Sequence, residues 1–389
     1  MADREPVIVG VAETPLENGV VPGGLSPLQI TAFAAKAAVE EAGLSLDDVD
    51  GLLTAGMWGN PGAGALPGLT LSEYLNIYPR FTDSTNIGGS AFEAHVAHAA
   101  MAIEKGYCEV ALITYASTQR SDASRTLGGR PAALTFQFET PYGMPTPAGG
   151  YAMAAMRHMH DFGTTREQLA NIAVNTRGWA MRNPAAMHRD PLTVDEVLAS
   201  PMICDPLHKL DCCLVTDGGG AVVMTSAENA RRLNKPAVHV RGYGESHTHW
   251  TMGAMPELSR LVAAERAGKA AFAMAGIGPD SIDLAEIYDS FTITVLLTLE
   301  ALGFCKPGEG GAFFENGRTA PGGAFPMNTN GGGLSFAHPG MYGIFLLIEA
   351  VRQLRGECGE RQVAGVKTAL CHGTGGTLSS GATAILAIN

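Results

Sequence analysis

One histidine, His338, ends a glycine-rich run, Asn328-Thr-Asn-Gly-Gly-Gly-Leu-Ser-Phe-Ala-His. Consecutive glycines allow positive φ angles and a close approach between backbone and ligand. The proline that follows the histidine stiffens the chain at that point. The pattern therefore predicts a turn that presents a polar side chain to a substrate. A tight turn with a purely structural histidine is the alternative, because a single glycine-rich run is a weak signal.

Other histidines and cysteines have spacings that only partly fit a metal site. His95 and His98 stand at i and i+3 of a predicted helix, and no third ligand follows nearby. A denser group of cysteines comprises Cys204, Cys212 and Cys213. This group lacks the Cys-x-x-Cys spacing typical of zinc. We therefore expect no metal, and the cysteines are expected to line the core or a substrate tunnel, which leaves their role open.

Composition excludes several classes of function. The 389 residues exceed the usual ceiling for one hydrophobic core, which predicts two similar units or one large layered domain. The net charge of −12 opposes binding to nucleic acid, whose phosphates would be repelled. No run approaches the roughly 20 apolar residues that span a bilayer. The first residues lack a leader pattern and the seven cysteines are odd in number, so we expect a cytoplasmic protein with reduced thiols.

Two segments share one pattern at a constant offset. Residues 35–50 and 268–283 both read as an alanine-rich helix that closes at Ala-Gly, followed by Asp, a β-branched residue and Asp. Such self-similarity predicts duplication of a whole domain, with a first half at 1–240 and a second at 241–389. Chance is the alternative, since helices of this kind are common. An irregular insert, at about 118–211, is expected to form a loop or lid.

Each half is predicted to present a glycine-lined helix N-terminus. The turn at 86–90 opens a helix through Lys105, and Gly331 to Gly333 are expected to open the helix that carries His338. A helix N-terminus offers free N–H groups and partial positive charge, which suit an anionic oxygen.

Four ordered blocks resemble the thiolase superfamily, in particular its lipid-transfer-protein (SCP-x-like) branch. The blocks are Asp217-Gly in a central strand, Tyr288-Asp-Ser-Phe, the glycine run that ends at His338-Pro, and Cys371-x-Gly373. The resemblance covers nearly the whole chain. It implies an α/β fold, the duplicated five-layer α-β-α-β-α arrangement, usually as a homodimer.

The chain departs from that pattern at the nucleophile. Thiolases carry a reactive cysteine at the N-terminus of the helix in the first half, and here the stretch reads Gly88-Gly89-Ser90, with Gly88 expected in place of the cysteine. Ser90 aligns with a serine of the family, and as a nucleophile it would need a base. Acyl-enzyme chemistry is therefore not expected.

The resemblance assigns roles to four side chains. His338 would donate a hydrogen bond to a thioester oxygen, which matters most when that oxygen becomes an enolate. Tyr288 and Tyr342 would handle the proton of a substrate hydroxyl. Cys371 would protonate the released carbon, which requires a tuned pKa. Two tyrosines that merely pack at turn–helix junctions are the alternative.

The remaining expectations also follow from the resemblance. Gly88, Gly89, His372 and Gly373 are expected to contact the substrate, with coenzyme A as part of the substrate and no other cofactor. Thiolase-like steroid side-chain aldolases lack the nucleophile and use tyrosines. They work with a small OB-fold protein, often with a zinc ribbon, of the DUF35 type, so a heterotetramer is expected here as one arrangement.

The first functional hypothesis is a lyase that cleaves a β-hydroxyacyl-CoA by retro-aldol chemistry, giving a ketone or aldehyde and a short acyl-CoA. An acetyl-CoA acyltransferase acting on a β-ketoacyl-CoA is the second hypothesis. A non-catalytic subunit that binds acyl-CoA or lipid is the third. The acyl group, the direction of reaction and the need for a partner stay open at this point.

Overall fold

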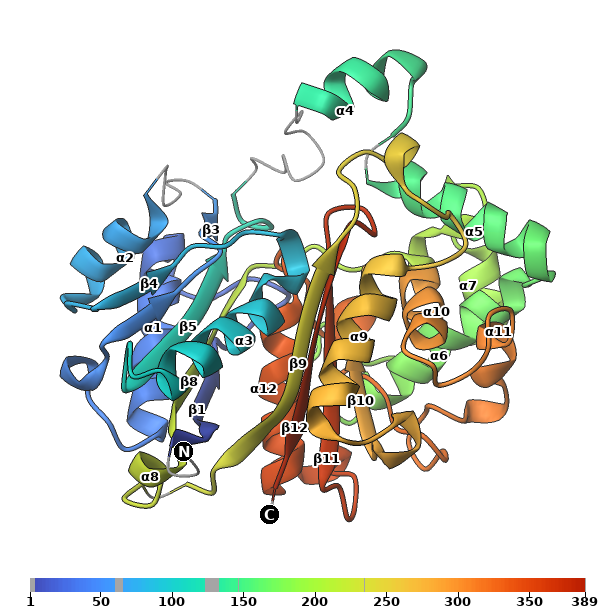
Figure 1. Ribbon diagram of the computed structural model, residues 1–389. Coiled ribbons are helices and arrows are strands. Elements are labelled where there is room, and N and C mark those ends of the chain that lie inside the picture. The colour runs from blue at the N-terminus through green and yellow to red at the C-terminus, as the bar shows by residue number, and fades with distance from the viewer. Residues whose placement is uncertain (1–3, 60–65, 123–132, 146, 234, 389) are drawn as a thin grey trace.

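The computed structural model describes residues 4–59, 66–122, 133–145, 147–233 and 235–388 (Figure 1). The described residues form a mixed ten-stranded sheet in the order β10-β11-β12-β9-β1-β8-β5-β2-β4, with β3 paired to β5. The first half of the sheet consists of β1 (Pro6–Glu13), β2 (Gly51–Leu53), β3 (Met57–Trp58), β4 (Phe81–Asp83), β5 (Val110–Ser117) and β8 (Gly218–Ser226). The second half consists of β9 (Val238–His247), β10 (Leu284–Ile287), β11 (Thr368–Gly375) and β12 (Ser380–Ala387). A separate hairpin joins β6 (Met202–Cys204) and β7 (Leu207–His208).

The two halves of the sheet meet at a narrow seam. Strands β1 and β9 pair there through two residue pairs, Val7 with His239 and Ile8 with Val238. Helices α3 (Ala91–Glu104) and α12 (Gly343–Arg355) contact strands of both halves and lie between them (Figure 1). Helix α1 (Pro27–Glu41) covers the outer face of the first half, and α9 (Val262–Ala275) covers that of the second. The predicted five-layer thiolase arrangement is therefore confirmed.

The sequences of the two central helices explain their position. Residues 344–348 of α12 are an unbroken apolar run, and each is at most 2% exposed. Along α3 alanines alternate with larger apolar residues such as Phe92 and Val96, both fully buried. Most residues of both helices are buried, including the polar Glu93 and Glu349, so both helices must be covered on nearly all sides. A position between the two halves of the sheet satisfies that requirement.

The predicted repeat corresponds to one structural unit present twice. Helices α1 and α9 are followed by glycines in left-handed conformation, Gly43 with φ +77° and Gly276 with φ +68°. Short 3-10 turns at 46–48 and 279–281 then lead into β2 and β10. The predicted boundary at 240/241 lies within β9, which pairs along most of its length with β12, and it stays a prediction.

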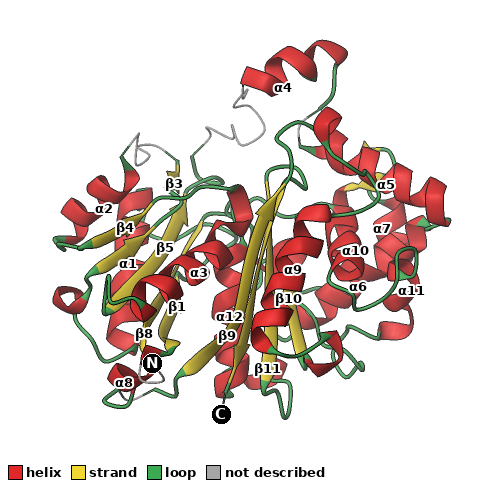
Figure 2. Ribbon diagram, in the orientation of Figure 1, coloured by secondary structure: helices red, strands yellow, loops and turns green. Residues whose placement is uncertain are grey.

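The prediction that the insert at about 118–211 is irregular was wrong, because much of this segment is helical (Figure 2). It contains α4 (Ala133–Phe138), α5 (Ala148–Phe162), α6 (Arg166–Ala180) and α7 (Val194–Ala199). A capping box between Thr165 and Gln168 starts α6, and this signal was present in the sequence. The other helices are α2 (Pro67–Leu75), α8 (Ala227–Ala230), α10 (Thr292–Ala301) and α11 (Gly310–Phe313). No helix in the described ranges is long and apolar enough to cross a membrane.

Candidate active site

A cavity of about 1450 Å³ opens where the two halves and the insert meet. Its walls come from the start of α3 with Gly88 and Gly89, from α5 with Tyr151, and from Tyr288 and His338 of the second half. The volume exceeds the roughly 300–1,000 Å³ that is typical of small-molecule sites. A large ligand such as an acyl-CoA therefore has room here.

Two of the predicted catalytic side chains meet in this wall. The hydroxyl oxygen of Tyr288 lies 2.9 Å from Nε2 of His338, and both residues line the cavity. Tyr288 follows directly after β10, and its backbone N–H donates to the carbonyl of His372 on the neighbouring strand β11. The backbone N–H of Tyr342 donates to the same phenol oxygen over 3.2 Å. A hydroxyl that accepts this bond still has its own proton to give to the imidazole.

His338 does not lie on a helix, which corrects the prediction. A π-helical turn, Gly332–Phe336, follows the glycines, and α12 begins only at Gly343, so His338 lies in the loop between the two. Thr216 holds this loop from the other side: its hydroxyl accepts from the N–H of His338 over 3.0 Å, and its own N–H donates to the carbonyl of His338. No pattern in the sequence indicates this contact.

Burial determines the protonation of the pair. Desolvation lowers the pKa of His338 to about 4, so the imidazole is neutral near pH 7. Desolvation also raises the pKa of Tyr288 well above its ordinary value. The neighbouring Asp289 is fully buried, and desolvation raises its pKa to about 7, although backbone N–H groups of Gly333 and Leu334 oppose the shift. The resting site therefore holds a neutral phenol beside a neutral imidazole.

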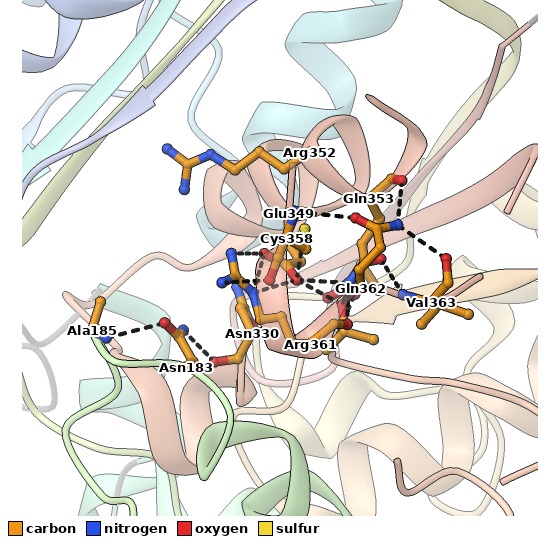
Figure 3. A network of polar contacts seen from close by, with 12 residues as sticks. Asn183, Ala185, Asn330, Glu349, Arg352, Gln353, Cys358, Arg361, Gln362 and Val363 are labelled. Carbon is orange, nitrogen blue, oxygen red and sulfur yellow. Dashed lines mark hydrogen bonds and ion pairs between the residues drawn. The ribbon is translucent and has the colours of Figure 1, made fainter. Parts of the chain in front are cut away.

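Tyr342 is placed behind this pair and does not line the cavity. Its hydroxyl donates to Oδ1 of Asn330 over 2.8 Å, and its ring stacks on His338 with centroids 6.1 Å apart. Asn330 in turn accepts from Asn183, at the edge of a polar network around Glu349 (Figure 3). In this arrangement Tyr342 supports the pair through its N–H and its ring, and its predicted role in proton transfer is not supported by the position of its hydroxyl.

The two predicted substrate-contacting glycines at the start of α3 differ in what they face. Gly88 has φ +77°, and a Cβ there would lie 2.6 Å from the backbone nitrogen of Gly376. A Cβ on Gly89 would lie 2.2 Å from Cε2 of Tyr288. The space for a side chain at 89 is thus filled by the Tyr288 ring. A Cβ at residue 89 would therefore point at the Tyr288 ring, whereas one at residue 88 would meet the backbone of Gly375 and Gly376; the place of the missing cysteine at Gly88 stays a prediction.

The C-terminal motif lies further from the cavity than predicted. Cys371, His372 and Gly373 are central residues of strand β11, and none of the three lines the cavity. The thiol of Cys371 is buried against the carbonyl of Leu346 in α12, at 3.6 Å, and burial raises its pKa well above the ordinary value. The imidazole of His372 pairs with Thr383 through Nδ1 over 2.8 Å. Only the end of the strand, from Thr374 onward, reaches the cavity.

Three further wall residues are Cys213, which was predicted to line the core or a substrate tunnel, and Tyr151 and Arg120, for which no role was predicted. Cys213 lines the cavity, and burial raises the pKa of its thiol well above the ordinary value. Tyr151 stacks on Phe291 with ring centroids 4.2 Å apart and donates to the carbonyl of Gly376 over 3.2 Å. Arg120 is also on the wall. Tyr151 and Arg120 come from the insert, for which the sequence predicted only a loop or lid.

The histidines of α3 and the serine at its start bind other protein groups. His98 pairs with Asp83 and with Glu245, and Nε2 of His95 contacts the carbonyl of Thr85 at 2.9 Å. Across the described ranges no group of three or more potential metal ligands gathers. Ser90 bonds Ser380 at 2.7 Å and does not face the catalytic pair.

Comparison with known proteins decides the family. The model of the thiolase C-terminal domain matches residues 244–388. A 17-hydroxy-3-oxo-4-pregnene-20-carboxyl-CoA lyase of Mycobacterium tuberculosis is 35% identical, over 98% of this chain and 99% of its own length. The chain belongs to the thiolase superfamily. Within the superfamily it falls in the SCP-x-like branch.

Two further members of the superfamily that resemble this chain are named for different reactions. An acetyl-CoA acetyltransferase of Methanothermobacter thermautotrophicus is 33% identical, over 96% of this chain and 97% of its own length. A solved structure described as an Ltp2-ChsH2(DUF35) aldolase superposes with a TM-score of 0.88 at 32% identity, covering 100% of this chain and 99% of the other. Lyases and a transferase therefore both resemble this chain. The residues that line the cavity are the basis for choosing between the two reactions.

Proposed function

We propose that this thiolase-fold chain is a carbon–carbon lyase that cleaves a β-hydroxyacyl-CoA by retro-aldol chemistry. One observation carries the proposal: the ring of Tyr288, whose hydroxyl pairs with His338 at 2.9 Å, fills the space that a side chain at residue 89 would need. The relatives named as a CoA lyase and as an aldolase support the same chemistry. The products are a ketone or aldehyde and a shorter acyl-CoA.

The proton in this reaction follows the observed hydrogen bond. The substrate hydroxyl gives its proton to the oxygen of Tyr288 as the phenol proton moves to Nε2 of His338. The bond between the α- and β-carbons breaks, and its electron pair becomes the thioester enolate. The imidazolium beside it offsets the negative charge. The proton then returns along the same path to the α-carbon, so the cycle needs no further acid.

This mechanism changes two of the predicted roles. His338 serves as the proton acceptor behind Tyr288, where the sequence predicted a hydrogen-bond donor to the thioester oxygen. Cys371 has no part in it, since its thiol points to Leu346 and away from the cavity. Contacts of Gly88 and Gly89 with the substrate remain part of the proposal, because both line the cavity.

An acyltransferase is the second candidate, favoured by the acetyl-CoA acetyltransferase among the relatives. It needs a nucleophile on the wall, and Cys213 is the thiol found there. Burial, with Cys212 and Asp289 nearby, raises the pKa of Cys213 and keeps it protonated. The thiolate is the reactive form of cysteine, so this thiol is poorly suited to attack a thioester.

The proposed substrate carries a bulky acyl group, and the proposed assembly includes a partner. A cavity of about 1450 Å³ suits a polycyclic or aromatic side chain, and one relative is named for a steroid thioester. We propose a homodimer that binds a small DUF35-type protein, because the superposed aldolase is a chain of such a complex. Co-expression with a DUF35-type protein and measurement of the mass of the purified complex test this part.

The decisive experiment follows products and protein mass together. The protein, alone and with a DUF35-type partner, is incubated with a β-hydroxyacyl-CoA and separately with a β-ketoacyl-CoA. We expect cleavage of the hydroxy substrate with no change in protein mass. Tyr288→Phe should lower kcat by about 10²–10⁴-fold, the usual worth of a positioned acid–base group. Tyr243→Phe, the same change outside the cavity, is the control.

Three results would contradict the proposed lyase function. A protein that gains an acyl mass with the keto substrate would establish the transferase, and loss of that adduct in Cys213→Ala would locate it. Full activity of Tyr288→Phe would remove the phenol from the mechanism. Binding of both thioesters without turnover, in the presence of the partner, would favour a binding subunit.

A further inference from the structure

We propose that Asp289 is a positioning residue that sets the distance between the Tyr288 hydroxyl and the His338 imidazole by clamping the glycine turn between them. The inference rests on the proposed function for its kinetic readout, although its structural readout does not. Asp289 follows Tyr288 directly in the chain, whereas His338 lies about fifty residues further on. A contact from Asp289 to the turn before His338 therefore joins the two partners.

The carboxylate of Asp289 makes that contact with both oxygens. The N–H of Gly333 donates to Oδ1 over 2.6 Å, and the N–H of Leu334 donates to Oδ2 over 3.1 Å. The side chain is fully buried. Asp289 thus holds two consecutive N–H groups of the turn in place.

The turn is packed tightly between the carboxylate and the imidazole. A Cβ on Gly332 would lie 2.0 Å from Oδ2 of Asp289. A Cβ on Gly333 would lie 3.0 Å from Oδ1 of Asp289 and 3.0 Å from Cδ2 of His338. Gly333 therefore lies between the two residues, and we expect a displacement of the carboxylate to shift the turn against the imidazole. This packing also explains why the sequence has consecutive glycines here.

Other contacts hold the loop on both sides of the turn. Before the glycines, the amide of Asn328 accepts from the N–H of Ile287 over 2.8 Å and donates to its carbonyl over 2.9 Å, at the end of β10. Leu214 donates its N–H to the carbonyl of Gly333 over 2.9 Å, and Thr216 bonds the backbone of His338 on the same side. Both belong to the segment that precedes β8, so they hold the loop against the first half. Asp289 differs from Asn328 in the residues that it holds: it bonds Gly333 and Leu334, which are nearer to His338 in the chain, and it directly follows Tyr288.

The substitution Asp289→Asn distinguishes a role in positioning Tyr288 and His338 from a role in folding alone. The amide has the same size but one acceptor, and its NH₂ group faces a backbone N–H that it cannot accept. We expect the turn to move away and kcat to fall by about 10²-fold, as for a misplacement of about 1 Å, with KM changed by less than about threefold. A residue important only for folding would lower the melting temperature and leave kcat of the folded protein unchanged.

Glu300 provides a matched control within the same chain. Its Oε1 accepts the N–H groups of Gly308 and Gly310 over 2.9 and 2.8 Å, so it too is a buried carboxylate that holds a glycine loop. Its Oε2 lies 3.1 Å from Nε2 of His158, and the amide of a glutamine would remove the acceptor from that contact. It does not line the cavity. Glu300→Gln should therefore lower the melting temperature while kcat stays at the wild-type level.

Crystal structures and steady-state kinetics of both variants test the proposal. We expect the Tyr288–His338 distance to exceed 3.5 Å in Asp289→Asn and to stay near the native 2.9 Å in Glu300→Gln. An unchanged distance and unchanged kcat in Asp289→Asn would overturn the inference. If Asp289→Asn fails to fold, Asp289→Glu keeps the charge but adds a methylene, and the same two readouts apply. If the wild-type protein has no lyase activity, the proposed function is refuted. A longer Tyr288–His338 distance in Asp289→Asn would still support the positioning role of Asp289 in that case.

Discussion

Replacement of Gly89 by alanine tests whether the Tyr288 ring occupies the space of the missing side chain. The added Cβ would stand 2.2 Å from Cε2 and 2.6 Å from Cζ of the ring, and 2.6 Å from the backbone oxygen of Thr374. An ordinary carbon–carbon contact is about 3.5 Å, so the ring must retreat by about 1.3 Å. The carbonyl of Thr374 belongs to β11 and cannot yield as easily as a side chain.

The retreat has a predictable kinetic result. The Tyr288–His338 bond, now 2.9 Å, would lengthen beyond the reach of a hydrogen bond if the ring moved away by that amount. We expect kcat to fall by about 10²-fold, the usual result of a displacement of this size near the chemistry. Overpacking should also cost about 1–3 kcal/mol of unfolding free energy.

The assay compares Gly89→Ala with Gly278→Ala. An added Cβ at Gly278 would meet nothing within 4 Å, and this residue lies away from the cavity. Turnover of a β-hydroxyacyl-CoA and thermal unfolding are measured for both variants. Wild-type kcat in Gly89→Ala would refute the steric reasoning, whether or not stability had changed.

Two further predictions concern strand β11. Cys371→Ser should retain kcat within about threefold, because the thiol faces Leu346; a loss of 10²-fold or more would restore its predicted role as a proton donor. Burial lowers the pKa of His372 to about 3, so the unfolded chain binds its proton first and stability is lost as the pH falls below about 6.5. His372→Asn should therefore reduce the slope of unfolding free energy against pH, between pH 4 and 6, by up to about 1.4 kcal/mol per pH unit. An unchanged slope in urea titrations would show that His372 is already protonated in the fold.

The repeated helix–strand unit could be predicted because it is marked by local chemistry. Helices α1 and α9 end at glycines that adopt positive φ, a conformation that few other residues take. Their apolar faces and the following strands have the periods that burial demands. The insert was misjudged because its many methionines, prolines and polar residues were given more weight than the capping box at Thr165.

The motifs of the candidate site could be predicted from the sequence, but the directions in which their side chains point could not all be predicted. Tyr288 and His338 are brought together as the resemblance implied. Cys371 and His372 were placed at the site because their motif matched, yet a strand buried on both faces shows no polar alternation that would reveal where each side chain points. The choice between Gly88 and Gly89 likewise depends on backbone direction at the start of a helix. Thr216 was missed because its partner, His338, is distant in the sequence.

The narrow seam between β1 and β9 gives a bound substrate a mechanical role. The sheet is continuous there through only two residue pairs, while the cavity wall takes Gly89 from one half and Tyr288 from the other. A ligand that contacts both residues would therefore connect the two halves of the sheet and restrict their relative motion. Saturation with an unreactive thioester analogue at about 100 times its Kd should stabilise the fold by about 2.7 kcal/mol. Because α3 and α12 are shared by both halves, that gain should appear as one later melting transition of the entire chain.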